Sequence, residues 1–223
     1  MDAPNQPGVA SLRVAFEVSA LARGVVAATF VGLAGDWSSP VVVVLALVTG
    51  LTFFDLGRRY HAERAERADL VRDRFGGAMQ LAFFAILCAA AWDNRSRTVW
   101  AVPGVVEMFG LGVIVGGVCL RQSAAQALGR HFTVKLSLLD DHQLISTGPY
   151  RWLRHPNYTG LALVALGTAS MVRSPTAAVV ALGVWLPIML LRVRDEERAL
   201  RDGLGAAYAD YSRRSWRLVP GIY

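Results

Sequence analysis

The stretch YTGLALVALGTASMVRSPTAAVVALGVWLPIMLL, residues 158–191, decides the fold. It contains two apolar runs, 158–172 and 175–191, and its single charged residue, Arg173, lies between them. Proline starts a helix readily but does not continue one, so the connection Arg173-Ser174-Pro175 allows only a sharp reversal of the chain. The stretch therefore predicts two helices joined as a tight antiparallel hairpin.

Four further apolar runs precede this hairpin, at about 13–34, 40–57, 75–92 and 98–120. A bilayer core is crossed by about 17 to 25 mostly apolar residues, and 54% of the 223 residues are hydrophobic. The sequence predicts an all-α integral membrane protein with five or six transmembrane helices. The number is six if the first run, which Glu17 and Arg23 interrupt, crosses the membrane instead of lying along its surface.

The basic residues predict the orientation of these helices. Segments 58–74, 121–157 and 192–223 carry 18 of the 23 Lys and Arg residues, and with six crossings all three lie on one side. That side is expected to be the cytoplasm, since loops rich in Lys and Arg stay inside. The net charge of +6 is carried beside hydrophobic segments, so we expect anionic lipid headgroups, not nucleic acid, as its counter-charge.

Polar, aromatic and turn-forming residues are concentrated in GRHFTVKLSLLDDHQLISTGPYRWLRHPNYTG, residues 129–160. Two turn signals, Thr147–Tyr150 and His155–Tyr158, flank a short basic stretch, and the second leads into the fifth helix. The N-terminus of a helix suits a carboxylate or another anionic group. In a membrane protein, irregular backbone of this kind lines a cavity or is buried in protein, so this segment is the candidate site.

The segment also carries a family pattern, H-x-L-[VI]-x-x-G-x-Y-x-x-x-R-H-P-x-Y-x-G. The matching residues are His142, Leu144, Ile145, Gly148, Tyr150, Arg154, His155, Pro156, Tyr158 and Gly160. A second element, an Arg followed by a Glu-Glu pair and Leu, is matched by Arg192, Glu196, Glu197 and Leu200. In these features the chain resembles the isoprenylcysteine carboxyl methyltransferase family and related phospholipid methyltransferases.

The resemblance implies a site for S-adenosylmethionine, with S-adenosylhomocysteine as product, on the cytoplasmic side. The implied cofactor contacts are Lys135, His142, Gln143, Leu144, Ile145, Tyr150, His155, Pro156, Asn157, Tyr158 and Glu196. It also implies Arg192 as the group that faces the acceptor. The activity expected from the closest family is O-methylation of a lipophilic carboxylate such as an isoprenylcysteine.

The residues themselves add further expectations. Glu107 lies inside the fourth apolar run, where an ionisable group is costly, so it is a candidate for the acceptor pocket or for pairing with an arginine. His142 is a second catalytic candidate, as a base. Cys88 and Cys119 lie in apolar runs without metal-ligand spacing, and no metal site is expected.

Other charged and aromatic residues of the C-terminal half are expected at the membrane surface. Tyr208, Tyr211 and Trp216 would anchor the tail at the interface, and Arg151, Arg154, Arg213 and Arg214 would contact headgroups. The expected organisation is residues 1–120 as N-terminal membrane helices and 121–223 as a methyltransferase core. The core is divided into a cofactor loop 121–157, the hairpin 158–191 and a cytoplasmic segment 192–223.

Several functions stay open at this stage. A phospholipid amine or a phenolic lipid is an alternative acceptor, and a phenol would need a base such as His142 or Glu107. Sterol reductases carry a similar RHPNY-type turn but use a nicotinamide cofactor, and they tend to have an acidic residue where this chain has Leu161. A silent lipid-binding scaffold is the third class, against which the retained motif residues argue.

Overall fold

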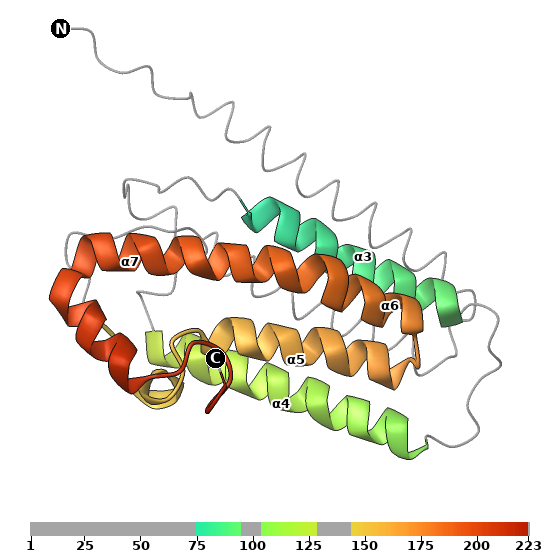
Figure 1. The fold of residues 1–223 in the computed structure, drawn as a ribbon. Helices are drawn as coiled ribbons and strands as arrows, with labels where there is room; N and C mark the ends of the chain where they lie inside the picture. Colours follow the sequence, from blue (N-terminus) through green and yellow to red (C-terminus); the bar gives the residue numbers. More distant parts are fainter. Residues whose placement is uncertain (1–74, 95–103, 129–143, 223) are drawn as a thin grey trace, which may run out of the picture.

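The fold is seen in a computed structural model of the 223-residue chain, which describes residues 75–94, 104–128 and 144–222 (Figure 1). The helices are α3 (Gly76–Asn94), α4 (Val105–Leu128), α5 (Pro156–Met171), α6 (Pro175–Val180) and α7 (Leu186–Arg214). A 3₁₀ turn, η2 (Gly148–Arg151), precedes α5, and a π-helical turn, η3 (Ala181–Trp185), joins α6 to α7. Over the described residues the expected helical class is confirmed, and an isolated bridge between Leu153 and Trp216 is the β-type pairing.

The apolar runs correspond to helices wherever the structure describes them. Runs 13–34 and 40–57 lie outside the described residues. The helix α4 continues past the expected end at residue 120 to Leu128, because Ala and Gln dominate the residues after Arg121 and favour helix. Within residues 75–94, 104–128 and 144–222, two helices, Val105–Leu128 and Pro175–Arg214, are long and apolar enough to cross a membrane, by length and composition.

The tight hairpin is confirmed, with α5 ending at Met171 and α6 beginning at Pro175. Arg173 adopts a positive φ of 50° in the reversal. Ser174 caps α6 by accepting a hydrogen bond from the Ala177 backbone at 3.0 Å, and its hydroxyl donates to Asp93 of α3 at 2.6 Å. The hairpin turn is therefore fastened to the end of α3.

The helices α4 and α5 lie side by side (Figure 1), and four glycines let them pack backbone to backbone. Gly110 on α4 faces Gly167 on α5, and Gly117 on α4 faces Gly160 on α5. The two glycines of each helix are seven residues apart, which is about two helical turns. A Cβ added at Gly117 would lie 2.6 Å from the Gly160 carbonyl oxygen. Small residues of this kind allow close helix contact inside a membrane, where apolar surface alone does not drive association.

The helix α7 changes direction at Gly205. This residue has φ 52° and ψ −123°, a conformation that glycine adopts without a steric cost from Cβ. Beyond it, residues 206–214 bend back toward the start of α5, and the C-terminal tail follows them (Figure 1). The bend brings the end of the chain to the motif segment.

Candidate functional site

The C-terminal tail pairs with the backbone of the RHPNY turn. The Arg154 amide donates to the Trp216 carbonyl at 2.7 Å, and the His155 amide donates to the Arg217 carbonyl at 3.2 Å. The Trp216 amide returns a bond of 2.8 Å to the Trp152 carbonyl. Two segments about 60 residues apart in sequence therefore meet at the N-terminus of α5, where Pro156 occupies the first turn.

A hydrogen-bonded line of three side chains joins α5 to α7. Arg192 Nε donates to the Tyr158 hydroxyl at 2.7 Å, and this hydroxyl donates to Glu196 Oε2 at 2.8 Å. Arg192 and Tyr158 are buried, whereas the Glu196 side chain is 28% exposed to solvent. The rings of His155 and Tyr158 are tilted against each other at 5.8 Å between centroids. The structure thus brings together four of the predicted site residues.

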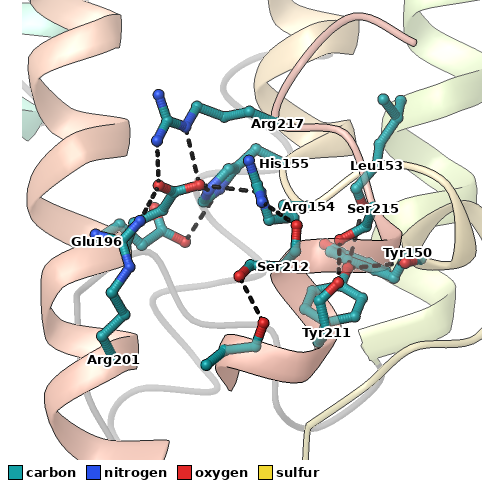
Figure 2. Close-up of polar contacts among 12 residues, drawn as sticks. Tyr150, Leu153, Arg154, His155, Glu196, Arg201, Tyr211, Ser212, Ser215 and Arg217 are labelled. Atoms are coloured by element: carbon teal, nitrogen blue, oxygen red, sulfur yellow. Dashed lines mark hydrogen bonds and ion pairs between the residues drawn. The ribbon is translucent and has the colours of Figure 1, made fainter. Parts of the chain in front are cut away.

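The centre of this region is Glu197, a motif residue for which no separate role is expected from the sequence. Arg217 donates to both of its carboxylate oxygens, at 3.0 and 2.7 Å, and Arg201 donates at 2.9 Å. Arg154 Nε lies 3.1 Å and His155 Nε2 lies 3.5 Å from Glu197 Oε1. Three arginines and His155 thus converge on one carboxylate (Figure 2).

Burial alone would raise the pKa of Glu197, whose side chain is 1% exposed. The contact with His155 and the hydrogen bonds from Arg217, together with the positive charge of Arg154, outweigh that penalty and lower this pKa to about 2. Glu197 is therefore ionised at neutral pH, and it holds together the turn, α7 and the tail.

Three expectations for the membrane surface are wrong. Arg154 pairs with Glu197 and also donates to the Ser212 carbonyl at 2.7 Å, so it is an internal contact. Tyr208 and Tyr211 are buried, and the Tyr211 hydroxyl donates to the Tyr150 carbonyl at 2.8 Å (Figure 2). The reason is the bend at Gly205, which turns this part of α7 inward over the motif segment. Trp216, by contrast, is 47% exposed.

The remaining predicted site residues are placed as follows. Lys135, His142 and Gln143 lie outside the described residues. Leu144 and Ile145 are half-buried on the approach to η2, and Tyr150 is buried within it.

A residue of α4 also reaches the turn. Asn157 accepts a hydrogen bond of 3.3 Å from Arg121 Nε, and Arg121 is buried at the motif end of α4. Sequence reasoning counted Arg121 only as one of the basic residues of its segment. The close packing of α4 on α5 places Arg121 here. Its side chain runs directly over Gly160, where an added Cβ would lie 2.5 Å from Arg121 Cγ.

Glu107 lies at the other end of the helices. It pairs with Arg173 Nε at 2.6 Å, beyond the C-terminus of α5, so the structure does not bring it together with Arg192. Pairing with an arginine is one of the roles expected for Glu107. Among the described residues, no group of three or more His, Cys, Asp or Glu is arranged to hold a metal ion.

The chemistry of this arrangement suits a zwitterionic or cationic ligand beside an anionic one. A partly exposed carboxylate flanked by aromatic rings favours an ammonium or sulfonium group. A buried guanidinium favours a carboxylate, which it can hold through two parallel hydrogen bonds. One turn of α7 separates Glu196 from Arg192, so two such ligands would lie side by side.

Comparison with known proteins identifies similar chains. Residues 109–202 match the model of the isoprenylcysteine carboxyl methyltransferase family. A probable protein-S-isoprenylcysteine O-methyltransferase from Oryza sativa subsp. indica is 30% identical over 171 residues, which are 75% of this chain and 87% of that protein. The protein-S-isoprenylcysteine O-methyltransferase of Mus musculus is 34% identical over 126 residues, covering 55% of this chain and 42% of that one.

A solved structure shares the fold. The eukaryotic intramembrane Ras methyltransferase superposes with a TM-score of 0.55 at 18% identity, covering 97% of this chain and 88% of that chain. The rice relative is matched over most of its length, and the family match covers both motif elements. The chain therefore belongs to the isoprenylcysteine carboxyl methyltransferase family.

Proposed function

We propose that this protein is an integral membrane S-adenosylmethionine-dependent methyltransferase that O-methylates the carboxylate of a lipophilic acceptor of the isoprenylcysteine type. Family membership supports the reaction class, and the names of the relatives support the acceptor. The observation that carries the proposal is the line Arg192, Tyr158, Glu196, which sets a guanidinium beside a carboxylate at the motif turn.

The proposed cofactor site combines both motif segments. Its residues are Lys135, His142, Gln143, Leu144, Ile145, Tyr150, His155, Pro156, Asn157, Tyr158 and Glu196. S-adenosylmethionine, when bound, supplies a methyl group on a positively charged sulfur. Glu196 would pair with the ammonium group of its methionine part, and its partial exposure leaves it open to a water-soluble ligand. The rings of Tyr158 and Tyr150 would flank the positively charged or adenine part.

Arg192 is the residue proposed to bind the methyl acceptor. It is buried where α7 passes from its apolar to its charged part, so its guanidinium lies next to the apolar surface that would hold the lipophilic part of the acceptor. An ionised carboxylate oxygen is already a nucleophile, so this acceptor needs no base, and His142 would serve as base only for an acceptor that arrives protonated. The protein then contributes by holding donor and acceptor together and by excluding water.

The proposed placement is a multi-pass protein of five or six membrane helices with this site at the cytoplasmic face. The Lys and Arg distribution of the sequence supports that orientation. The C-terminal segment from Arg192 onward and the motif loop would lie on this side.

Steady-state kinetics of two variants test the assignment. Glu196→Gln should raise the KM for S-adenosylmethionine at least tenfold with little change in the KM for an S-prenylcysteine. Arg192→Gln should do the reverse and also lower kcat. Asp195→Asn, a matched change at the half-buried neighbour of Glu196 that pairs with Arg198, should leave both constants unchanged. Unchanged constants in both site variants, or tight NADPH binding without adenosylhomocysteine binding, would overturn the proposal.

A further inference from the structure

The hydroxyl of Tyr158 occupies a special position between Arg192 and Glu196. These two residues are four apart on α7 and can form an ordinary helical ion pair. A side chain of α5 also links them through hydrogen bonds, because the Tyr158 hydroxyl accepts from Arg192 and donates to Glu196. The hydroxyl is the one group of a tyrosine side chain that donates and accepts hydrogen bonds at the same time.

Solvent exposure increases along this link from Arg192 to Glu196. Arg192 is 4% exposed and Tyr158 is 7% exposed, while the Glu196 side chain is 28% exposed. The guanidinium carbon of Arg192 lies 6.0 Å from the centroid of the Tyr158 ring, so the ring also covers the cation. Hydrogen bonds in such a low-dielectric setting polarise one another, so a change at one end alters the bond at the other.

We propose that Tyr158 is a positioning residue that couples cofactor binding to acceptor binding. The inference rests on the proposed function of the site. Without ligands, the charge of Glu196 draws the Tyr158 hydroxyl, and the hydroxyl oxygen in turn holds Arg192. An ammonium group at Glu196 neutralises that carboxylate and weakens its hold on the hydroxyl. The guanidinium of Arg192 is then less compensated and binds an acceptor carboxylate more tightly.

The coupling is reciprocal, because each ligand must change the affinity of the other by the same factor. Typical coupling between sites amounts to a factor of about 5 to 150. We expect saturating S-adenosylhomocysteine to lower the Kd of an S-prenylcysteine by at least about 5-fold in the unmodified protein. Its ammonium group is the one that pairs with Glu196, and it transfers no methyl group, so binding is measured without turnover.

The experiment titrates the purified full-length protein with an S-prenylcysteine bearing a free carboxylate, with and without saturating S-adenosylhomocysteine. Tyr158→Phe removes the hydroxyl and keeps the ring that packs against His155. In this variant each ligand should still bind, and the ratio of the two Kd values should fall below about 2. A role of Tyr158 in packing alone would weaken both ligands and leave this ratio unchanged.

Tyr208→Phe is the matched control. Tyr208 is a buried tyrosine of α7 whose hydroxyl has no hydrogen-bond partner among the residues that the structure describes. Removing it should leave the Kd ratio as in the unmodified protein. If Tyr158→Phe does not fold, Glu196→Gln tests the same link, because a neutral amide cannot hold the hydroxyl as a carboxylate does.

The outcomes separate the two proposals. A ratio near 1 in the unmodified protein, or an unchanged ratio in Tyr158→Phe or Glu196→Gln, overturns the coupling and leaves the proposed function standing. Failure of the unmodified protein to bind either ligand overturns the proposed function, and the coupling with it.

Discussion

Replacing Glu197 with Gln removes the charge that organises the site while preserving the shape of the side chain. In the protein this carboxylate faces Arg154, His155, Arg201 and Arg217, and its side chain is 1% exposed. A glutamine would leave the three arginines close together without their shared counter-charge. Breaking a buried ion pair by removing one partner is strongly destabilising for that reason.

The magnitude follows from the pKa of Glu197, which is lowered from 4.5 to about 2. Each pKa unit corresponds to about 1.4 kcal/mol, so the ionised carboxylate contributes about 3 kcal/mol to the free energy of unfolding at pH 7. The folded pKa is the lower one, so this contribution is present above pH 4.5 and is lost as the pH falls toward 2. At pH 3 less than half of it, about 1.4 kcal/mol, should remain.

The assay compares thermal unfolding midpoints of the unmodified protein and Glu197→Gln between pH 7 and pH 3. At pH 7 the variant should unfold about 6 to 12 °C lower, and its tail should be cleaved faster by protease near Arg217. The control is Asp195→Asn, which breaks an exposed ion pair with Arg198 and should cost less than about 1 kcal/mol. Equal midpoints at pH 7, or a difference that does not shrink toward pH 3, would refute the reasoning.

Three further predictions concern packing and topology. Gly117→Ala should destabilise the protein by about 1 to 3 kcal/mol because the added Cβ meets the backbone of α5, whereas Gly112→Ala has open space around it and should be neutral or slightly stabilising. Thermal midpoints that rank the two variants the other way would contradict the glycine contact of α4 and α5. Tyr211→Phe should cost about 1 kcal/mol through loss of its bonds to the motif backbone, whereas Tyr208→Phe should cost less, and equal costs by chemical denaturation would argue against that role. A reporter enzyme that works only in the cytoplasm should be active when fused to the C-terminus, and one that works only in the periplasm or lumen should be inactive there. The opposite pattern would contradict the proposed orientation.

The hairpin, the apolar helices and the two motif segments could be predicted from sequence because their signals are local. The reversal at Arg173-Ser174-Pro175 is written in three consecutive residues. The end of α4 differs from the expected one because hydropathy marks only where apolar residues stop. The helix itself continues through polar residues with good helix propensity to Leu128.

The role of Glu197 could not be read in the same way. The sequence shows a Glu-Glu pair but not that its second member is surrounded by cations from three separate segments. Adjacent residues on a helix point in directions about 100° apart, so only the packing of α7 decides what each one meets. The burial of Tyr208 and Tyr211 depends in turn on the bend at Gly205, for which the glycine was the one local signal.

The most direct test of the central claim is methyl transfer by the purified protein in lipid vesicles, supplied with methyl-labelled S-adenosylmethionine and an S-prenylcysteine. We predict label in a lipid-soluble product from which mild alkali releases methanol, as it does from a carboxyl methyl ester. Absence of labelled product, or a label that withstands alkali, would contradict carboxylate O-methylation by this site.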